Sequence, residues 1–467
     1  MCEEGRRARI LSVLEKDGGR AHFIGVGGVS MSALAAWSVR LGLTVSGSDR
    51  EMSRTLSELC MLGVKAYSGH RPEMIADADI VIYSLAIGEG DEELRLARKS
   101  GTLTVSRAEY LGALMLRYKT RIGVSGAHGK SSVTAMLGSI FSTSYRHPTV
   151  LCGASISNNR PYVFGGEDVL IYEACEYRRA FLSFSPSIAL ILNVDFDHPD
   201  CYRSIEDVED AFIASARGAE LSVVNIDSAA ARRVFSEIGG KKISVGKSDE
   251  AEYRYEALGD GAYPEFNIYH LSRRVASLKL SVIGEHNAAN ATAAFAVANE
   301  YGITQKNIIS SLECFSGLER RGELLGRLGD SFVYYDYAHH PSEIRASIKA
   351  VRALGHKHVT VLFKPHTYTR TAALWDDFKS ALSMADRVIL TEIYPAREEP
   401  IQGITSERLA EEIGGRASFY GGFSALDALF SEKRGAIILM GAGNMAGIVE
   451  KILGNEKFSV DKRRSCE

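Results

Sequence analysis

The chain has 467 residues, which is enough for two to four domains of about 150 residues each. Hydrophobic residues make up 45% and charged residues 24%, and the net charge of -3 argues against a basic surface for bulk nucleic-acid binding. No apolar run approaches the roughly 20 residues of a membrane helix, and residues 1–19 lack the apolar segment of a signal peptide.

Short apolar runs alternate with helix-like segments along the chain, and this rhythm predicts α/β domains with largely parallel sheets. Breaks near residues 117 and 320 predict three domains, 1–117, 118–320 and 321–467. The expected strands, in chain order, are 21–28, 43–49, 79–87, 102–106, 121–126, 169–176, 187–195, 221–227, 242–246, 276–283, 331–338, 358–365, 387–395 and 436–443. Helices are expected at 30–41, 53–62, 91–99 and 287–302.

The first expected strand leads into a glycine-rich turn, GVGGVSMSALA at 25–35. Glycines let a backbone approach a diphosphate closely, and the N-terminus of the following helix offers N–H donors. Asp49, at the end of the next expected strand, is placed to accept a hydrogen bond from a ribose hydroxyl. Because Ser30 replaces the third glycine of GxGxxG, three interpretations stay open. They are an NAD(P) site, a site for another nucleotide diphosphate, which is favoured, and a tight turn without a ligand.

The strand at 121–126 leads into GVSGAHGKSSVTAML at 123–137, which has the pattern of a phosphate-binding loop. Backbone N–H groups of such a loop cradle phosphates, Lys130 would neutralise β/γ-phosphate charge, and the Ser131 hydroxyl can reach magnesium. Val124 stands where the first glycine of GxxxxGK[ST] belongs, so the spacing is GxxGxxGKS. The alternative, a glycine-rich turn with a surface lysine, is weaker in this context, and His128 taken alone is more typical of a loop residue than of a catalytic one.

Acidic residues follow two later strands of the same domain. They are Glu173 and Glu176 in YEACEYRRAF, and Asp195, Asp197 and Asp200, together with His198, in NVDFDHPD. Parallel sheets place ligands outside the carboxyl ends of their strands, so these side chains are expected near the phosphates. Oxygen ligands with one imidazole suit a magnesium ion that assists phosphoryl transfer. The seven cysteines contain no CxxC pair, which argues against a structural zinc site or a disulfide framework.

Taken in order, ten segments of the chain resemble the Mur ligase family. They are HFIGVGGVSMSALA, VSGSD, GAHGKSS, EACEYRRAF, NVDFDHPDCY, GEHNAANATAA, DYAHHPSEIRASI, FKPHTYTRTAAL, IYPAREEP and GAGNM. The resemblance implies an ATP-dependent amide ligase with a Rossmann-like N-terminal domain for a UDP-sugar, a central P-loop ATPase-like domain and a Rossmann-like C-terminal domain for an amino acid. EACEYRRAF and IYPAREEP are most similar to the branch that joins L-alanine to the carboxylate of UDP-N-acetylmuramate. That reaction proceeds through an acyl phosphate and releases ADP and phosphate in peptidoglycan precursor synthesis.

The resemblance also implies roles for the residues of the matching motifs. Residues that would bind the UDP-sugar are Gly25, Gly27, Gly28, Ser30 and Asp49. Residues that would bind ATP are Gly126, Ala127, His128, Gly129, Lys130, Ser131, Ser132, His286, Asn287, Asn290, Arg320, Arg321 and Asp336. The expected magnesium ligands are Ser131, Glu173 and His198. The amino-acid side would be lined by His339, His340, His366 and Arg370, and the catalytic set would be Lys130, Glu173, His198 and Arg370.

Three positions depart from the family's usual motifs. Ala127 stands where a threonine is usual, Cys175 where an acid is common, and Thr367 where some members have an arginine. These changes remove a hydroxyl, a charge near the metal and one cation, but no backbone N–H donor. They leave Arg370 as the visible bidentate partner for an amino-acid carboxylate. We expect them to affect the preferred amino acid and the rate more than the type of reaction.

Other functions stay open on the sequence alone. A sister ligase of the same family attaches a recycled tripeptide to the same UDP-sugar and shares the first glycine motif. An NAD(P)-dependent dehydrogenase would explain residues 25–49 but would leave the phosphate loop and the acidic clusters without a role. A non-catalytic nucleotide-binding partner is compatible with Cys175 and Thr367. As a ligase of cell-wall synthesis, the chain would act in the cytoplasm as a monomer or homodimer, without nucleic-acid or membrane partners.

Overall fold

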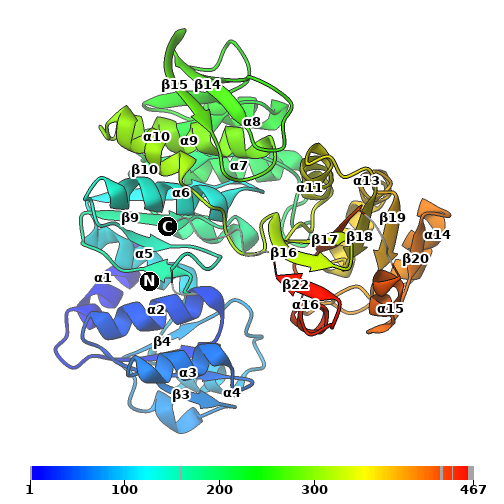
Figure 1. Cartoon of the computed structure of the whole chain (residues 1–467). Coiled ribbons are helices and arrows are strands. Elements are labelled where there is room, and N and C mark those ends of the chain that lie inside the picture. The colour runs from blue at the N-terminus through cyan, green and yellow to red at the C-terminus, as the bar shows by residue number, and fades with distance from the viewer. Residues whose placement is uncertain (1–2, 158–159, 432–434, 444, 461–467) are drawn as a thin grey trace.

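The computed structural model covers residues 3–157, 160–431, 435–443 and 445–460 and folds them into three α/β units (Figure 1). The N-terminal unit is blue in Figure 1, the central unit cyan to green, and the C-terminal unit yellow to red. Each unit has one sheet whose strand pairs are mostly parallel, which confirms the predicted fold class. Residue 444 of the GAGNM segment and two of the seven cysteines, Cys2 and Cys466, lie outside the described residues. No described helix is both long enough and apolar enough to cross a bilayer.

The N-terminal unit has a five-stranded parallel sheet in the order β3-β2-β1-β4-β5. Its elements are α1 Glu3–Leu14, β1 Arg20–Ile24, α2 Val29–Arg40, β2 Thr44–Asp49, α3 Arg54–Met61, β3 Lys65–Ser68, the 3₁₀ helix η1 Pro72–Ile75, β4 Ile80–Tyr83, α4 Glu92–Lys99, β5 Leu103–Ser106, α5 Arg107–Leu114 and η2 Met115–Arg117. Central β1 is buried almost throughout, as a strand covered on both faces must be. The predicted glycine-rich turn joins the end of β1 to the N-terminus of α2.

The central unit has a ten-stranded sheet in the order β15-β14-β13-β12-β11-β10-β6-β9-β7-β8. Its elements are β6 Thr120–Ser125, α6 Lys130–Thr143, β7 Thr149–Leu151, β8 Tyr162–Val163, β9 Val169–Glu173, η3 Tyr177–Ser183, β10 Ile188–Ile191, α7 Ile205–Ser215, β11 Leu221–Asn225, α8 Ala229–Glu237, β12 Lys242–Gly246, β13 Tyr253–Ala257, β14 Glu265–His270, β15 Arg273–Lys279, α9 His286–Glu300 and α10 Gln305–Glu313. Strand β6 lies between β9 and β10 and is parallel to both. The loops that leave these three strands therefore meet at one edge of the sheet.

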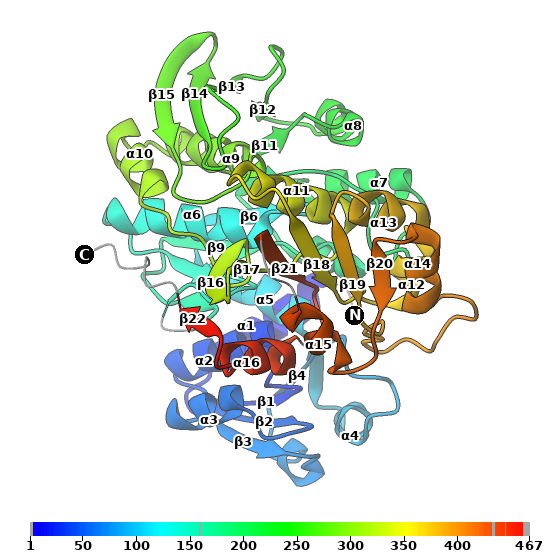
Figure 2. The ribbon, with the colours of Figure 1, turned by 45° about the vertical axis from the view of Figure 1, so that its right-hand side comes forward.

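The C-terminal unit has a seven-stranded sheet in the order β20-β19-β18-β21-β17-β16-β22. Its elements are β16 Glu323–Leu328, β17 Ser331–Asp336, α11 Pro341–Ala353, β18 Val359–Phe363, α12 Tyr368–Ala373, α13 Trp375–Leu382, β19 Arg387–Leu390, α14 Ser406–Ile413, β20 Ala417–Phe419, α15 Ser424–Phe430, β21 Gly435–Met440, α16 Ala446–Leu453 and β22 Phe458–Val460. Figure 2 shows this unit in front of the central unit. Helix α11 begins with a capping box formed by His340 and Glu343, and Ser342 in its first turn contacts the central unit.

Candidate active site

The phosphate loop joins β6 to α6 and places Lys130 at the first residue of the helix. Gly129 has a φ of +84°, and a Cβ there would lie 2.7 Å from Oδ1 of Asn290, so this position requires glycine. Asn193, which follows β10, braces the loop from the neighbouring strand. Its Oδ1 accepts from the His128 N–H at 2.8 Å, and its Nδ2 donates to the His128 carbonyl at 3.0 Å. Asn193 is not among the site residues that the sequence predicts, and its position directly after a strand is the one sequence feature that points to it.

The Lys130 ammonium is held by groups on both sides of the loop. Its Nζ donates to the carbonyl oxygens of Gly126 at 2.5 Å and Ala127 at 3.2 Å, and to Oε1 of Glu176 at 3.0 Å. Burial acts to raise the pKa of Glu176, but Lys130 outweighs it and lowers that pKa, so the carboxylate stays charged. Burial likewise opposes the charge of Lys130, and Glu176 raises the pKa of the amine. The loop therefore holds the Lys130 ammonium in place, and a bound phosphate group could replace Glu176 as its ionic partner.

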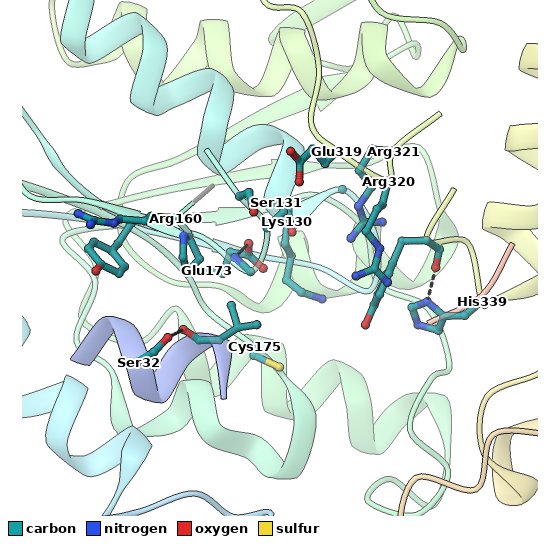
Figure 3. A pocket seen from close by; sticks show the side chains of 18 of the residues that line it. Ser32, Lys130, Ser131, Arg160, Glu173, Cys175, Glu319, Arg320, Arg321 and His339 are labelled. Carbon is teal, nitrogen blue, oxygen red and sulfur yellow. Dashed lines mark hydrogen bonds between the residues drawn. The ribbon is translucent and has the colours of Figure 1, made fainter. Parts of the chain in front are cut away.

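A cavity of about 560 Å³ adjoins Lys130 and is lined by residues of all three units (Figure 3). In Figure 3 Arg320, Arg321 and His339 approach Lys130 from the C-terminal side, while Ser32 and Arg160 lie toward the other end. The lining includes Val29, Ser32, Leu59, Lys130, Ser131, Arg160, Glu173, Cys175, Glu176, Asp197, His198, Arg320, Arg321 and His339. A ligand in this cavity would therefore touch the phosphate loop together with both flanking units.

The three expected magnesium ligands, Ser131, Glu173 and His198, line this one cavity. His198 has a φ of +55°, an uncommon backbone conformation for a residue with a side chain, which is typical of positions held for function. Its Nε2 lies 3.7 Å from Oε1 of Glu176, and the other oxygen of Glu176 is buried without a hydrogen-bond partner among the described residues. A hydroxyl, carboxylates and one imidazole form a donor set that fits Mg²⁺. By contrast, Asp200 is exposed and does not line the cavity.

A second cavity, of about 530 Å³, lies on the other side of the phosphate loop. Among its lining residues are the predicted ATP contacts His128, Gly129, Ser132, His286, Asn287, Asn290, Arg321 and Asp336. Burial raises the pKa of Asp336 to about 6. The second cavity thus brings these eight residues into one space, while the predicted ATP residues Ala127, Lys130, Ser131 and Arg320 line the first cavity.

His128 connects the phosphate loop to helix α11 of the C-terminal unit. Its Nε2 lies 2.8 Å from the Ser342 hydroxyl and 3.5 Å from Asp195, its Nδ1 lies 3.1 Å from Glu343, and its ring is 4.8 Å from the ring of His340. Burial acts to lower the pKa of His128, but the carboxylates of Glu343 and Asp195 outweigh it and raise that pKa to about 9. A charged imidazole therefore contributes to docking of the two units.

This contact predicts a pH-dependent stability. The pKa of His128 rises from 6.5 to about 9 on folding, so its contribution is fully present below pH 6.5 and is lost as the pH rises through about 9. We expect His128→Gln to lower the free energy of unfolding at pH 6 by up to about 3 kcal/mol, and so to lower the melting temperature. At pH 10 the substitution should have little effect. Calorimetry across this pH range measures the difference. His270→Gln, which removes another histidine–glutamate pair at 3.2 Å from Glu252, is the control. A His128→Gln penalty that does not change with pH would contradict the prediction.

The predicted UDP-sugar motif forms a compact turn at the end of β1. The Gly27 N–H donates to Oδ2 of Asp49 at 2.7 Å, and a Cβ on Gly27 would lie only 2.8 Å from that oxygen. Gly25 has a φ of +79°, and Gly28 caps the N-terminus of α2. The Ser30 hydroxyl accepts a hydrogen bond at 2.9 Å from Nη1 of Arg107, a cation that the sequence motifs do not single out. Val29 and Ser32 of the same segment line the first cavity, so this turn adjoins it.

The residues predicted on the amino-acid side lie in three places. His339 lines the first cavity, and burial lowers its pKa to about 3. His340 is buried against His128 instead. Arg370 and His366 contact one another, and the Arg370 guanidinium forms an ion pair with Asp197 of the central unit.

Family models match three successive parts of the chain. They are the "Mur ligase family, catalytic domain" at 20–119, the "Mur ligase middle domain" at 124–298 and the "Mur ligase, glutamate ligase domain" at 320–443. The chain is 37% identical to the UDP-N-acetylmuramate–L-alanine ligase of Clostridium acetobutylicum, covering 93% of this chain and 97% of that protein. It is 35% identical to the protein of the same name from Syntrophus aciditrophicus, covering 97% of both.

Solved structures show the same three-unit architecture. The UDP-N-acetylmuramate-alanine ligase of Thermotoga maritima superposes with a TM-score of 0.78 at 26% identity, covering 93% of this chain and 98% of that one. A murein peptide ligase from Psychrobacter arcticus superposes with a TM-score of 0.71 at 21% identity, covering 94% and 98%, and this likeness is one of fold alone.

Proposed function

The chain belongs to the Mur ligase family, and from this premise we propose that it joins L-alanine to the carboxylate of UDP-N-acetylmuramate. The reaction uses ATP and releases ADP and phosphate. Relatives of this name match over nearly the full length of the chain. The observation that carries the proposal is the position of Lys130 at a cavity to which all three units contribute.

The chemistry explains why cations gather there. A carboxylate is a poor electrophile, so ATP first transfers its γ-phosphoryl group to it, giving an acyl phosphate and ADP. Both reacting groups are anionic, and Lys130, Arg320 and Arg321 offset their charge. The neutral α-amine of alanine then attacks the acyl carbon and gives up a proton, and the tetrahedral oxyanion collapses to the amide as phosphate leaves. Cations already in place stabilise that oxyanion without reorganisation.

The three ligands are assigned to three regions of the site. The second cavity, with His286, Asn287 and Asn290, takes the nucleoside part of ATP, so that its phosphates reach the loop at Lys130. The turn between β1 and α2 holds the UDP-sugar, whose carboxylate extends into the first cavity. Ser131, Glu173 and His198 would hold Mg²⁺, which when bound would offset the charge of the β- and γ-phosphates.

The other functions lack comparable support. The murein peptide ligase shares the fold, whereas the relatives at 35–37% identity are alanine ligases by name. A dehydrogenase would not need the Lys130–Glu176 pair or the second cavity. A non-catalytic partner would not need Ser131, Glu173 and His198 around one cavity. We further propose that the protein works in the cytoplasm, where ATP is available, as a monomer or homodimer.

A substrate panel tests the proposed function. Phosphate release is measured with UDP-N-acetylmuramate, ATP and magnesium against L-alanine, L-serine, glycine and the cell-wall tripeptide. We expect L-alanine to give the highest kcat/KM, with ADP and a new amide formed in equal amounts. A clear preference for the tripeptide would assign the sister activity instead. No ADP with any acceptor, or tight binding of NADH in place of the UDP-sugar, would contradict the ligase.

A further inference from the structure

Arg370 is held across the interface between two units by a carboxylate that the proposed reaction does not use. Its Nε donates to Oδ1 of Asp197 at 2.8 Å and its Nη2 donates to Oδ2 at 3.2 Å. Both residues are only 4% exposed. Arg370 belongs to α12 of the C-terminal unit, and Asp197 follows β10 of the central unit. This bidentate pair therefore forms only when the two units are docked.

The remaining contacts of Arg370 fix the guanidinium further. Nη1 lies 3.0 Å from Nδ1 of His366, and because a guanidinium can only donate, Nδ1 is the acceptor. Burial, aided by Arg370, lowers the pKa of His366 to about 4, so the imidazole is neutral, as this role requires. Thr367 starts the helix with a φ of +66°, and its Oγ1 accepts from the Arg370 N–H. The unusual backbone conformation of Thr367 thus starts the helical turn that carries Arg370 to Asp197.

These contacts leave a defined set of donors on Arg370. A guanidinium has five N–H groups, and Asp197 takes one on Nε and one on Nη2, while His366 takes one on Nη1. One N–H on each terminal nitrogen remains, and these two groups can donate to a further acceptor such as a carboxylate. Asp197 lines the first cavity, and Arg370 lies directly behind it through this ion pair, without lining the cavity itself.

We propose that Asp197 is a positioning residue for the amino-acid substrate. By holding one edge of Arg370, it fixes the two remaining N–H groups as the binding point for the α-carboxylate, so that the α-amine faces the acyl carbon. The inference rests on the proposed function and adds a residue to it. A competing view has Asp197 occupy the place of the substrate carboxylate, and this view predicts the opposite change in affinity when Asp197 is removed.

Asp197→Asn tests the proposal, because the amide keeps the size of the side chain but loses the charge and the acceptor for Nη2 of Arg370. The remaining oxygen can stay in the Oδ1 position, where it accepts from the His198 N–H, so His198 keeps its place. We expect the KM for L-alanine to rise about tenfold or more, while kcat at saturating alanine and the KM for ATP change by less than about threefold. Glu209→Gln is the matched control, since Glu209 pairs with Arg233 through two oxygens at 3.0 Å within the central unit, away from the site. It should leave all three constants unchanged.

A second comparison shows whether Asp197 acts through Arg370. Arg370→Ala should itself raise the KM for alanine, and adding Asp197→Asn to it should raise that KM no further, because the positioned group is already gone. Fully additive effects would overturn the proposal, and so would a lower KM in Asp197→Asn, which would favour the competing view. An equal rise in the KM for alanine and ATP would show a general structural role and would also overturn it.

If the Asp197→Asn variant does not fold, Asp197→Glu tests the positioning role instead. It keeps the charge but moves it by one methylene, so we expect an intermediate rise confined to the KM for alanine. An unchanged KM, or one that rises together with the KM for ATP, would overturn the proposal. Wild-type protein that forms no alanine amide would instead refute the proposed function, before any variant is compared.

Discussion

Replacing Lys130 with alanine is expected to reduce ligation at least about 10³-fold. The Nζ of Lys130 is the cation that the phosphate loop itself supplies, and its loss would leave Glu176 buried without its ammonium partner. Binding of UDP-N-acetylmuramate should survive, because the turn at β1 and α2 belongs to another unit. Phosphate release measures the first effect, and calorimetric titration with the UDP-sugar measures the second.

Two further variants isolate the role of this lysine. Lys241→Ala removes a lysine whose Nζ pairs with Glu300 at 3.0 Å on a half-exposed surface of the same unit, and it should retain full turnover. Adding Glu176→Gln to Lys130→Ala should restore stability lost with the buried pair, but not turnover. Normal turnover in Lys130→Ala would refute the phosphate-loop assignment. Loss of UDP-sugar binding together with turnover would show that the variant had misfolded.

The sequence predicts the buried parallel strands well, because each is a continuous apolar run followed by a turn and a helix. It does not predict several strands that are short or partly exposed. Strand β3 is short and half exposed. Strands β13 and β14 carry charged residues on the solvent side, so none of these three strands shows a marked apolar run. Strands β16 and β22 pair antiparallel across more than 100 residues of chain, a contact that no local pattern encodes.

The candidate site also contains some features that the sequence predicts and others that it does not. Residues in contiguous motifs, such as Lys130 and Glu173, can be proposed from the sequence because the loop and its neighbouring strand end are local features. Contacts between units are not, since the pairing of Asp197 with Arg370 spans 173 residues and that of His128 with Ser342 spans 214. The sequence placed Asp197 with the acids near the phosphates and Arg370 with the amino acid. Only the fold shows that the two side chains meet.

His198→Ala is expected to raise the magnesium concentration for half-maximal turnover by at least about tenfold, with activity partly restored at high magnesium. The backbone of His198 is held at a φ of +55°, and its N–H donates to Oδ1 of Asp197 at 2.7 Å, which fixes the imidazole beside Glu176. Oxygen donors from Ser131 and Glu173 remain in the variant, so binding is weakened rather than abolished.

The control for His198→Ala is the substitution Asp200→Asn in the same loop. Asp200 lies two residues further on, is exposed and does not line the cavity, so Asp200→Asn should leave the magnesium dependence unchanged. If surface charge alone attracted the cation, the two variants would shift the half-maximal concentration equally. If the imidazole is a ligand, only His198→Ala shifts it, and the shift persists at high ionic strength because short-range coordination is screened far less than surface attraction. Turnover that is independent of magnesium in the wild type would remove the basis for a metal site here.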